Sequence, residues 1–356
     1  MNASTSTQSG IRNPQSAIPW LIVAAILYAA FAVYLYRPHF GQLTAWQWLL
    51  PASACLGAVG AYTLSRRWVA GFTGSFLAGA VYGFGPFLLG LAKFHASADF
   101  LAACVPWLFV PALFVEKKRG KWLGLPLLVL PFVAILLFFY LSAGYRLFAA
   151  PLQADVRPLD LVGFIAPLAL VDRSAALLGF YHVPVAMLVL GLAMVWKARR
   201  YSILLVMLAG LLLTFCQPFL GPHTVAWLGV SPILWLSIPI AWCAVLSGIG
   251  FQGLIEAGPA DKKWVLAAAI TLGVLAIAAQ VLAARCFQVF LGLGDGYARL
   301  FVQAAQMYLL GAIAITIVFF MARQNLRLHW LRWALLCAAL GIDIFLAAPY
   351  IVDKIL

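Results

Sequence analysis

Seven polar residues of this chain have side chains that suit proton transfer or the binding of an anion. They are His39, His95, Asp99, Arg157, Asp160, His182 and His223. An imidazole or a carboxylate can take the proton of a reacting hydroxyl, so His39 and Asp99 are the catalytic candidates. A guanidinium can hold a phosphate through two parallel hydrogen bonds. Arg157 therefore suits substrate binding, and we expect the remaining four residues to contact the same substrate.

These residues have simpler interpretations, and they predict no metal site. Each histidine taken alone suits an interfacial or packing role, so the group is more informative than any member. Metal ligands converge at bonding distance, whereas these side chains come from separate segments without ligand-like spacing. Five of the six cysteines lie inside apolar runs and only Cys286 lies outside one, so no disulfide framework is indicated.

Asp343 stands apart because it lies well inside the last apolar run of the chain. An ionisable group within a bilayer costs several kcal/mol unless it is paired, hydrated or protonated. A functional interpretation makes Asp343 the coupling or binding residue of a transporter. A structural interpretation makes it a buried carboxyl that is hydrogen-bonded to a neighbouring helix. Both interpretations stay open.

The segments that position these residues are predicted to be transmembrane helices. The chain is 65% hydrophobic and 9% charged, whereas soluble domains are about half apolar and one quarter charged. Runs such as 122–141 are apolar on every face, which excludes the alternating strands of a membrane barrel. We predict an all-α, polytopic integral membrane protein with about eleven spans. The spans are 19–36, 46–64, 68–91, 98–115, 122–141, 176–196, 202–220, 225–255, 264–284, 300–322 and 333–351.

Charge predicts how these spans are oriented. The net charge of +13 comes from short basic clusters between apolar runs, which indicates topology signals and no nucleic-acid partner. One set of alternate loops holds 15 of the 23 Lys and Arg residues, and the other set holds eight. The positive-inside rule then places the N-terminus in the cytoplasm and the C-terminus outside a bacterial cytoplasmic membrane. The seven candidate residues all fall on the outer side, so we expect a site that opens outward.

The chain divides into four predicted regions. Residues 1–17 are polar and form a disordered cytoplasmic tail. Residues 18–141 form an N-terminal bundle of about five spans, and residues 176–356 form a C-terminal bundle of about six. Residues 142–175 between them mix apolar anchors with charges, which suits amphipathic helices on the outer surface and equally a solvated connector.

Three stretches carry a resemblance to a known family. The first comprises 61–68 (AYTLSRRW) and 78–90 (AGAVYGFGPFLLG), followed by His95 and 105–113 (VPWLFVPAL). The second comprises 158–162 (PLDLV) and 179–184 (GFYHVP). The third comprises 232–242 (PILWLSIPIAW) and 246–251 (LSGIGF). Their order resembles that of the GT-C class of membrane glycosyltransferases, particularly its bacterial YfhO-like branch.

The resemblance implies a GT-C-like bundle that works on lipid-linked sugars. Enzymes of the class take a sugar from a polyprenyl-phosphate donor, with an acidic residue in the first outer loop as base or as ligand to a divalent metal. Here the first outer loop, 37–45, contains no Asp or Glu, and Ser237 and Ala241 stand where the class has arginines. His39 or Asp99 would have to supply the base.

These observations lead to three hypotheses for function. The first is a reduced or non-catalytic GT-C-like protein in outer-surface glycan or lipid-linked sugar assembly. It would bind membrane lipids and a lipid-linked sugar, and it needs no cofactor unless it is catalytic. The second is a lipid or small-solute transporter that uses Asp343. The third is a structural subunit that packs against membrane protein partners.

The division of basic residues predicts the location of the C-terminus. A reporter fused after Leu356 should be active outside the cytoplasm, because an odd number of spans separates it from the cytoplasmic N-terminus. At this position, activity of an alkaline phosphatase fusion reports an outside location, and fluorescence of a green fluorescent protein fusion reports a cytoplasmic one. Fluorescence with no phosphatase activity would mean that the predicted number of spans is wrong by one.

Overall fold

The fold is a bundle of helices. The computed structural model describes residues 17–44, 47–69, 71–91, 96–115, 121–145, 191–195, 201–216, 232–258, 261–285, 295–324 and 328–355. The predicted all-helical class is confirmed for these residues, which contain no strand. The helices are α1 (Ala17–Tyr36), the short 3-10 helix η2 (Arg37–His39), α2 (Leu49–Ser65), α3 (Phe72–Gly83), α4 (Pro86–Leu91), α5 (Ala96–Val115), α6 (Lys121–Tyr145), α8 (Tyr201–Cys216), α10 (Pro232–Trp235), α11 (Ser237–Glu256), α12 (Lys262–Arg285), α14 (Asp295–Arg323) and α15 (His329–Ile355).

Within the described ranges, three helical segments are long and apolar enough to cross a membrane. They are Ile18–His39, Phe72–Leu91 and Ile233–Glu256. Five shorter apolar helical segments accompany them, namely Leu49–Ser65, Ser97–Leu113, Pro126–Phe138, Tyr201–Phe215 and Tyr308–Arg323. Apolar helices therefore lie where spans were predicted. The number eleven stays a prediction.

Two predicted spans each contain two helices. In the run 68–91, α3 ends at Gly83 and α4 starts at Pro86, because a residue before proline is disfavoured in the helical region and proline donates no hydrogen bond. In the run 225–255, α10 and α11 are separated at Leu236. There the hydroxyl of Ser237 donates to the carbonyl oxygen of Leu234 at 2.6 Å.

Part of the predicted organisation lies outside the described residues. Residues 1–16 of the predicted tail 1–17 belong to this part, as do most of the predicted outer segment 142–175 and most of the predicted span 176–196. Residue Ala17 is the first residue of α1. Helix α6 continues to Tyr145, a few residues beyond the predicted end of its span. The division into two bundles around 142–175 therefore stays a prediction.

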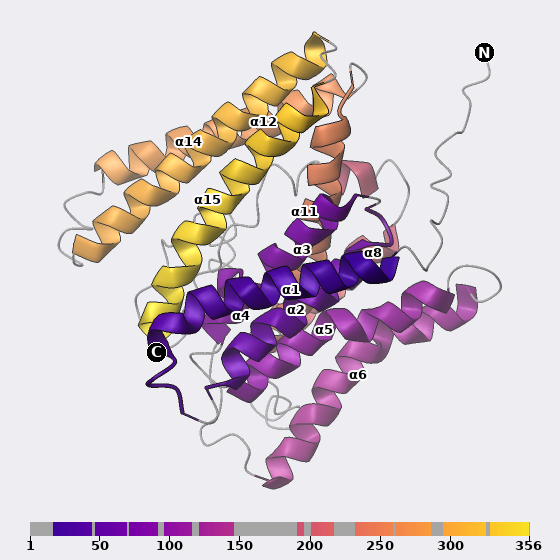
Figure 1. Ribbon diagram of the computed structural model, residues 1–356. Coiled ribbons are helices and arrows are strands. Elements are labelled where there is room, and N and C mark those ends of the chain that lie inside the picture. The colour runs from indigo at the N-terminus through magenta and orange to yellow at the C-terminus, as the bar shows by residue number, and fades with distance from the viewer. Residues whose placement is uncertain are drawn as a thin grey trace.

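Helix α11 forms the centre of the bundle. Residues 237–251 of α11 are all buried, as are Gly253 and Leu254. The helix packs on α3, α8, α2, α15 and α5. Figure 1 shows α12, α14 and α15 gathered on one side of it and α1, α2, α5 and α6 on the other. Helices from the N-terminal part of the chain, such as α2 and α3, and the C-terminal helix α15 therefore pack on the same buried helix.

Helix α3 packs against α2 through glycines. A Cβ atom on Gly79 would lie 2.5 Å from the carbonyl oxygen of Ala58 and would also meet the hydroxyl of Tyr28. A Cβ atom on Gly83, one turn later, would lie 2.6 Å from the Cβ atom of Ala58. Small residues four apart let helix backbones approach closely, and close van der Waals packing holds helices together in lipid.

The opposite face of α3 meets α11 in the same way. A Cβ atom on Gly74 would lie 2.9 Å from the carbonyl oxygen of Gly248, and one on Gly248 would lie 2.6 Å from the carbonyl oxygen of Gly74. Glycine is thus required on both helices at this crossing. Helix α3 is held between α2 and α11 by backbone contact on each side.

Arginines satisfy the carbonyl groups at two helix ends. Arg332, buried at the start of α15, donates from Nη1 to the carbonyl oxygens of Ala257 at 2.6 Å and Ile255 at 3.3 Å, where α11 ends. Arg67 donates from Nη1 to the carbonyl oxygen of Leu113 at 2.9 Å, near the end of α5. The last carbonyl groups of a helix lack partners within it, and cations there also oppose the helix dipole.

Large apolar side chains cover the outer faces of several helices. Ile26 on α1, Leu205 on α8 and Ile277 on α12 are 62%, 64% and 64% exposed. Contiguous apolar surface of this kind is rare on soluble proteins. It suits helices whose outer faces contact lipid, as the composition predicts.

The α2–α3 contact predicts a stability effect for Gly79→Ala. The added methyl group would overlap the backbone of α2, and overpacking of this kind costs about 1–3 kcal/mol. We expect the melting temperature of the purified protein in detergent to fall by several degrees. The control is Gly273→Ala on α12, where a Cβ atom would meet nothing within 4 Å. Equal melting temperatures for the two variants would contradict the packing described for α3.

Candidate functional site

His39, one of the two catalytic candidates, lies in η2 and pairs with the last helix of the chain. Its Nε2 lies 2.9 Å from Oδ1 of Asp353 on α15. The side chain of His39 is 16% exposed and that of Asp353 is 64% exposed, so the pair is open to solvent. A carboxylate that fixes the orientation of an imidazole is the arrangement that a histidine general base requires.

Asp353 was missed as a functional candidate because it stands near the end of the chain, away from every motif. A signal for it existed in the predicted topology. With an odd number of spans, the end of the last helix and the first outer loop fall on the same side of the membrane. That topology predicts one membrane depth for Asp353 and His39, and the structure brings the two side chains into contact.

Asp99, the other catalytic candidate, lies in the first turn of α5 and is 2% exposed. The hydroxyl of Ser53, on α2, lies beside its carboxyl group without completing a good hydrogen bond. Tyr36 at the end of α1 and Tyr82 on α3 are within electrostatic range of the same carboxyl group. Four helices thus enclose Asp99 in a polar cluster that an acceptor hydroxyl does not reach in this conformation.

His39 and Asp99 lie at the same end of the bundle but in different surroundings. His39 is accessible and paired, whereas Asp99 is enclosed. The other five predicted site residues, His95, Arg157, Asp160, His182 and His223, lie outside the described residues, so their convergence stays a prediction. Within the described ranges, no group of three or more His, Cys, Asp or Glu residues could hold a metal ion.

Asp343 has a defined backbone position within α15. Its side chain lies outside what the structure describes. Both interpretations of Asp343 therefore stay predictions.

An apolar groove of about 410 Å³ lies between α1, α3 and α15. Six of its twelve lining residues are aromatic. Tyr28 and Phe76 stack with ring centroids 4.7 Å apart, and Phe31 meets Phe84 edge to face at 4.6 Å. The hydroxyl of Tyr28 is occupied, since it donates to the carbonyl oxygen of Phe76 at 2.6 Å.

One wall of this groove leaves room for an added side chain. Gly341 on α15 lines the groove, and a Cβ atom there would meet nothing within 4 Å. At another point of the lining, Nε1 of Trp333 donates to the hydroxyl of Thr73 at 2.9 Å. The groove thus offers aromatic and aliphatic surface, and its main polar groups already have partners.

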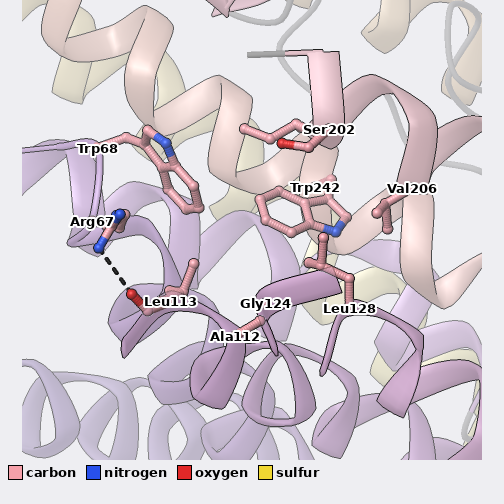
Figure 2. Close-up of a pocket in the computed structure, with 10 residues that line it drawn as sticks. Arg67, Trp68, Ala112, Leu113, Gly124, Leu128, Ser202, Val206 and Trp242 are labelled. Atoms are coloured by element: carbon pink, nitrogen blue, oxygen red, sulfur yellow. Dashed lines mark hydrogen bonds between the residues drawn. The ribbon is translucent and has the colours of Figure 1, made fainter. Parts of the chain in front are cut away.

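A second cavity of about 300 Å³ lies where α2 and α5 end and where α6 and α8 begin (Figure 2). It has a different chemical character, because Arg67, two indole rings and Ser202 line it. None of its lining residues had been predicted as a site residue. The two indole rings, Trp68 and Trp242, lie far apart in sequence, so only their packing at 5.5 Å reveals the cavity.

No family model, curated protein or solved structure matches this chain. Its function must therefore be inferred from its own residues and cavities. The His39–Asp353 pair, the enclosed Asp99, the aromatic groove and the second cavity are the features that bear on it.

Proposed function

We propose that this protein binds the hydrocarbon chain of a membrane lipid in the aromatic groove and acts in outer-surface glycan or lipid-linked sugar assembly as a reduced GT-C-like protein. The observation that carries the proposal is the groove itself. Its volume of about 410 Å³ is in the usual range of small-molecule sites. The three stretches that resemble the GT-C class support the link to lipid-linked sugars.

The chemistry of the groove favours a lipid chain over a polar solute. Its described polar groups are used within the protein, so a solute that needs hydrogen bonds would lose those it makes with water. A hydrocarbon chain makes no hydrogen bonds with water, so it loses none when it enters the groove. Because α1 presents exposed apolar side chains beside the groove, such as the 44% exposed Leu27, a chain can enter from the bilayer side.

Selective binding in this groove must come from close packing. A chain that moves from lipid into the groove gains no hydrophobic free energy, since its surroundings are apolar in both places. Contact with the flat faces of Tyr28, Phe31 and Phe76 is what distinguishes the groove from lipid. The planar double bonds of a polyprenyl chain match these flat surfaces better than a saturated acyl chain does.

The predicted orientation and number of spans fit this proposal. The contact between His39 and Asp353 places the ends of α1 and α15 together. With an even number of spans, the end of α15 would lie on the side of the membrane opposite the first loop, and Asp353 could not meet His39. We propose eleven spans in a bacterial cytoplasmic membrane, with the N-terminus inside and the polar end of the bundle outside.

The His39–Asp353 pair supports a catalytic form of the proposal. His39 would take the proton of an acceptor hydroxyl as its oxygen bonds to the anomeric carbon and as the bond to the polyprenyl phosphate breaks. Asp353 would hold the imidazole in the required orientation. Asp99 is enclosed, so the base role falls to His39. No group of three or more metal-ligating side chains lies among the described residues, and the proton transfer to His39 needs no metal.

Filling the groove tests the proposed lipid binding. We expect Gly341→Leu to lower photocrosslinking of a diazirine-labelled polyprenyl phosphate by about fivefold, a loss of roughly 1 kcal/mol, because the new side chain occupies the space of the lipid chain. The matched control is Gly273→Leu, at an equally open position of α12 away from the groove. The yield of cross-linked peptide, measured by mass spectrometry in nanodiscs, gives the result. Equal yields from the two variants would exclude the groove as the binding site.

The catalytic form makes a separate prediction. With polyprenyl-phosphate glucose as donor in nanodiscs, loss of a general base in His39→Gln should slow release of the sugar by about 100-fold. Asp353→Asn should slow it as well, because the imidazole loses its orienting partner. Asp99→Asn is the control and should retain most of the rate. If His39→Gln and the parent protein release sugar equally, or if neither releases any from a panel of such donors, the non-catalytic form holds.

A further inference from the structure

Among the ten lining residues of the second cavity, four carry hydrogen-bond donors in their side chains, namely Arg67, Trp68, Ser202 and Trp242, and the other six are apolar. The cavity is formed by the ends of α2 and α5, the first turns of α6 and α8, and Trp242 of α11. Figure 2 shows the ring of Trp242 between Ser202 and Leu128, with Arg67 and Trp68 across the cavity. None of the described lining residues is Asp or Glu. A bound cation would therefore find no carboxylate partner here.

Two indole N–H groups at this cavity find no acceptor among the described residues. Trp242 is 2% exposed, and its Nε1 is buried without a hydrogen-bond partner. The same holds for Nε1 of Trp68, whose ring meets Trp242 edge to face. Leaving a buried donor unsatisfied costs about 1–3 kcal/mol. A ligand with acceptor oxygens would remove this cost.

The local charge is also positive. Arg67 is held at the cavity by its hydrogen bond to Leu113, which also offsets the partial negative charge at the end of α5. Gly124 lies in the first turn of α6, and Ser202 and Ile203 lie in the first turn of α8. Helix starts carry partial positive charge and unpaired backbone N–H groups, which favour anions.

We infer that this cavity binds a phosphate group, carried either by a small soluble anion or by a lipid headgroup. Phosphate presents acceptor oxygens in several directions, which suits donors that come from three sides of the cavity. A volume of about 300 Å³ holds a headgroup-sized ligand and no whole lipid. In the sequence, 116–120 and 196–200 adjoin α5, α6 and α8 and hold six Lys and Arg residues and one acid, Glu116, so their net positive charge would raise the local concentration of anions.

This site is independent of the proposed function. The cavity lies beside Arg67, where α2 and α5 end. The His39–Asp353 pair lies where α1 and α15 end. Loss of lipid binding in the aromatic groove would leave the cavity unaffected. In the predicted topology it faces the cytoplasm.

Two variants and two matched controls test the phosphate site. Trp242→Phe removes one N–H group and keeps the ring that packs on Trp68. Arg67→Gln removes the charge and keeps a donor for Leu113. The controls make the same changes away from the lining, in Trp48→Phe at the far end of α2 and in Arg66→Gln beside the site.

Binding is measured with inorganic phosphate in detergent at constant ionic strength, and with nanodiscs of phosphatidylcholine that contain or lack phosphatidic acid. Thermal shift and native mass spectrometry report the bound species. We expect each lining variant to weaken binding by about tenfold, as the loss of a charge-assisted hydrogen bond predicts, and each control to bind like the parent. Binding of phosphate itself identifies a soluble anion, and retention of phosphatidic acid alone identifies a headgroup. If neither probe binds, or if lining variants and controls bind alike, the proposal is wrong.

Discussion

The close approach of backbones on both faces of α3 is the contact on which the bundle depends. Gly79 and Gly83 let α3 lie against α2, and Gly74 with Gly248 lets it lie against α11. In lipid, apolar side chains gain nothing by leaving one apolar surrounding for another, so helix association relies on this close packing. Helix α11 is buried because α3 and its other neighbours surround it. Larger residues at these crossings would separate α3 from α2 and α11.

Polar groups complete the two ends of this bundle in different ways. At one end, Arg67 and Arg332 satisfy carbonyl groups where α5 and α11 finish. The basic residues that predict topology therefore have a second role, as partners for helix ends. At the other end, His39 and Asp353 join the first loop to the last helix, and Asp99 lies in a closed cluster. The same end thus holds one accessible polar pair and one enclosed acid.

The two cavities differ in their chemistry. The aromatic groove has occupied polar groups and suits a hydrocarbon chain. The second cavity has a guanidinium and two indole donors that find no partner among the described residues, and we propose an anion as its ligand. They are formed by different helices, because α1 and α15 line only the groove and α6 and α8 line only the second cavity. Each can therefore be altered without the other.

The sequence by itself determined the helical class and the positions of most helices. Both follow from local rules, since apolar runs in lipid must satisfy their own backbone hydrogen bonds and proline or charge ends them. Ser237 and Pro86 mark two breaks that the length of the apolar runs alone did not reveal. His39 was predicted as a candidate from its type and place in the first loop. Asp99 was predicted as its counterpart, but type and place could not show that four helices enclose it.

Only the tertiary structure decided which residues meet. Asp353 reaches His39 across 314 positions, and Trp242 meets Trp68 from another helix. Helix α11 is apolar on nearly every face, so no polar stripe indicates how it packs. The packing of glycines and large rings makes that choice, and it depends on all the neighbouring helices together. The groove and the second cavity result from that packing, so no local pattern in the sequence predicted them.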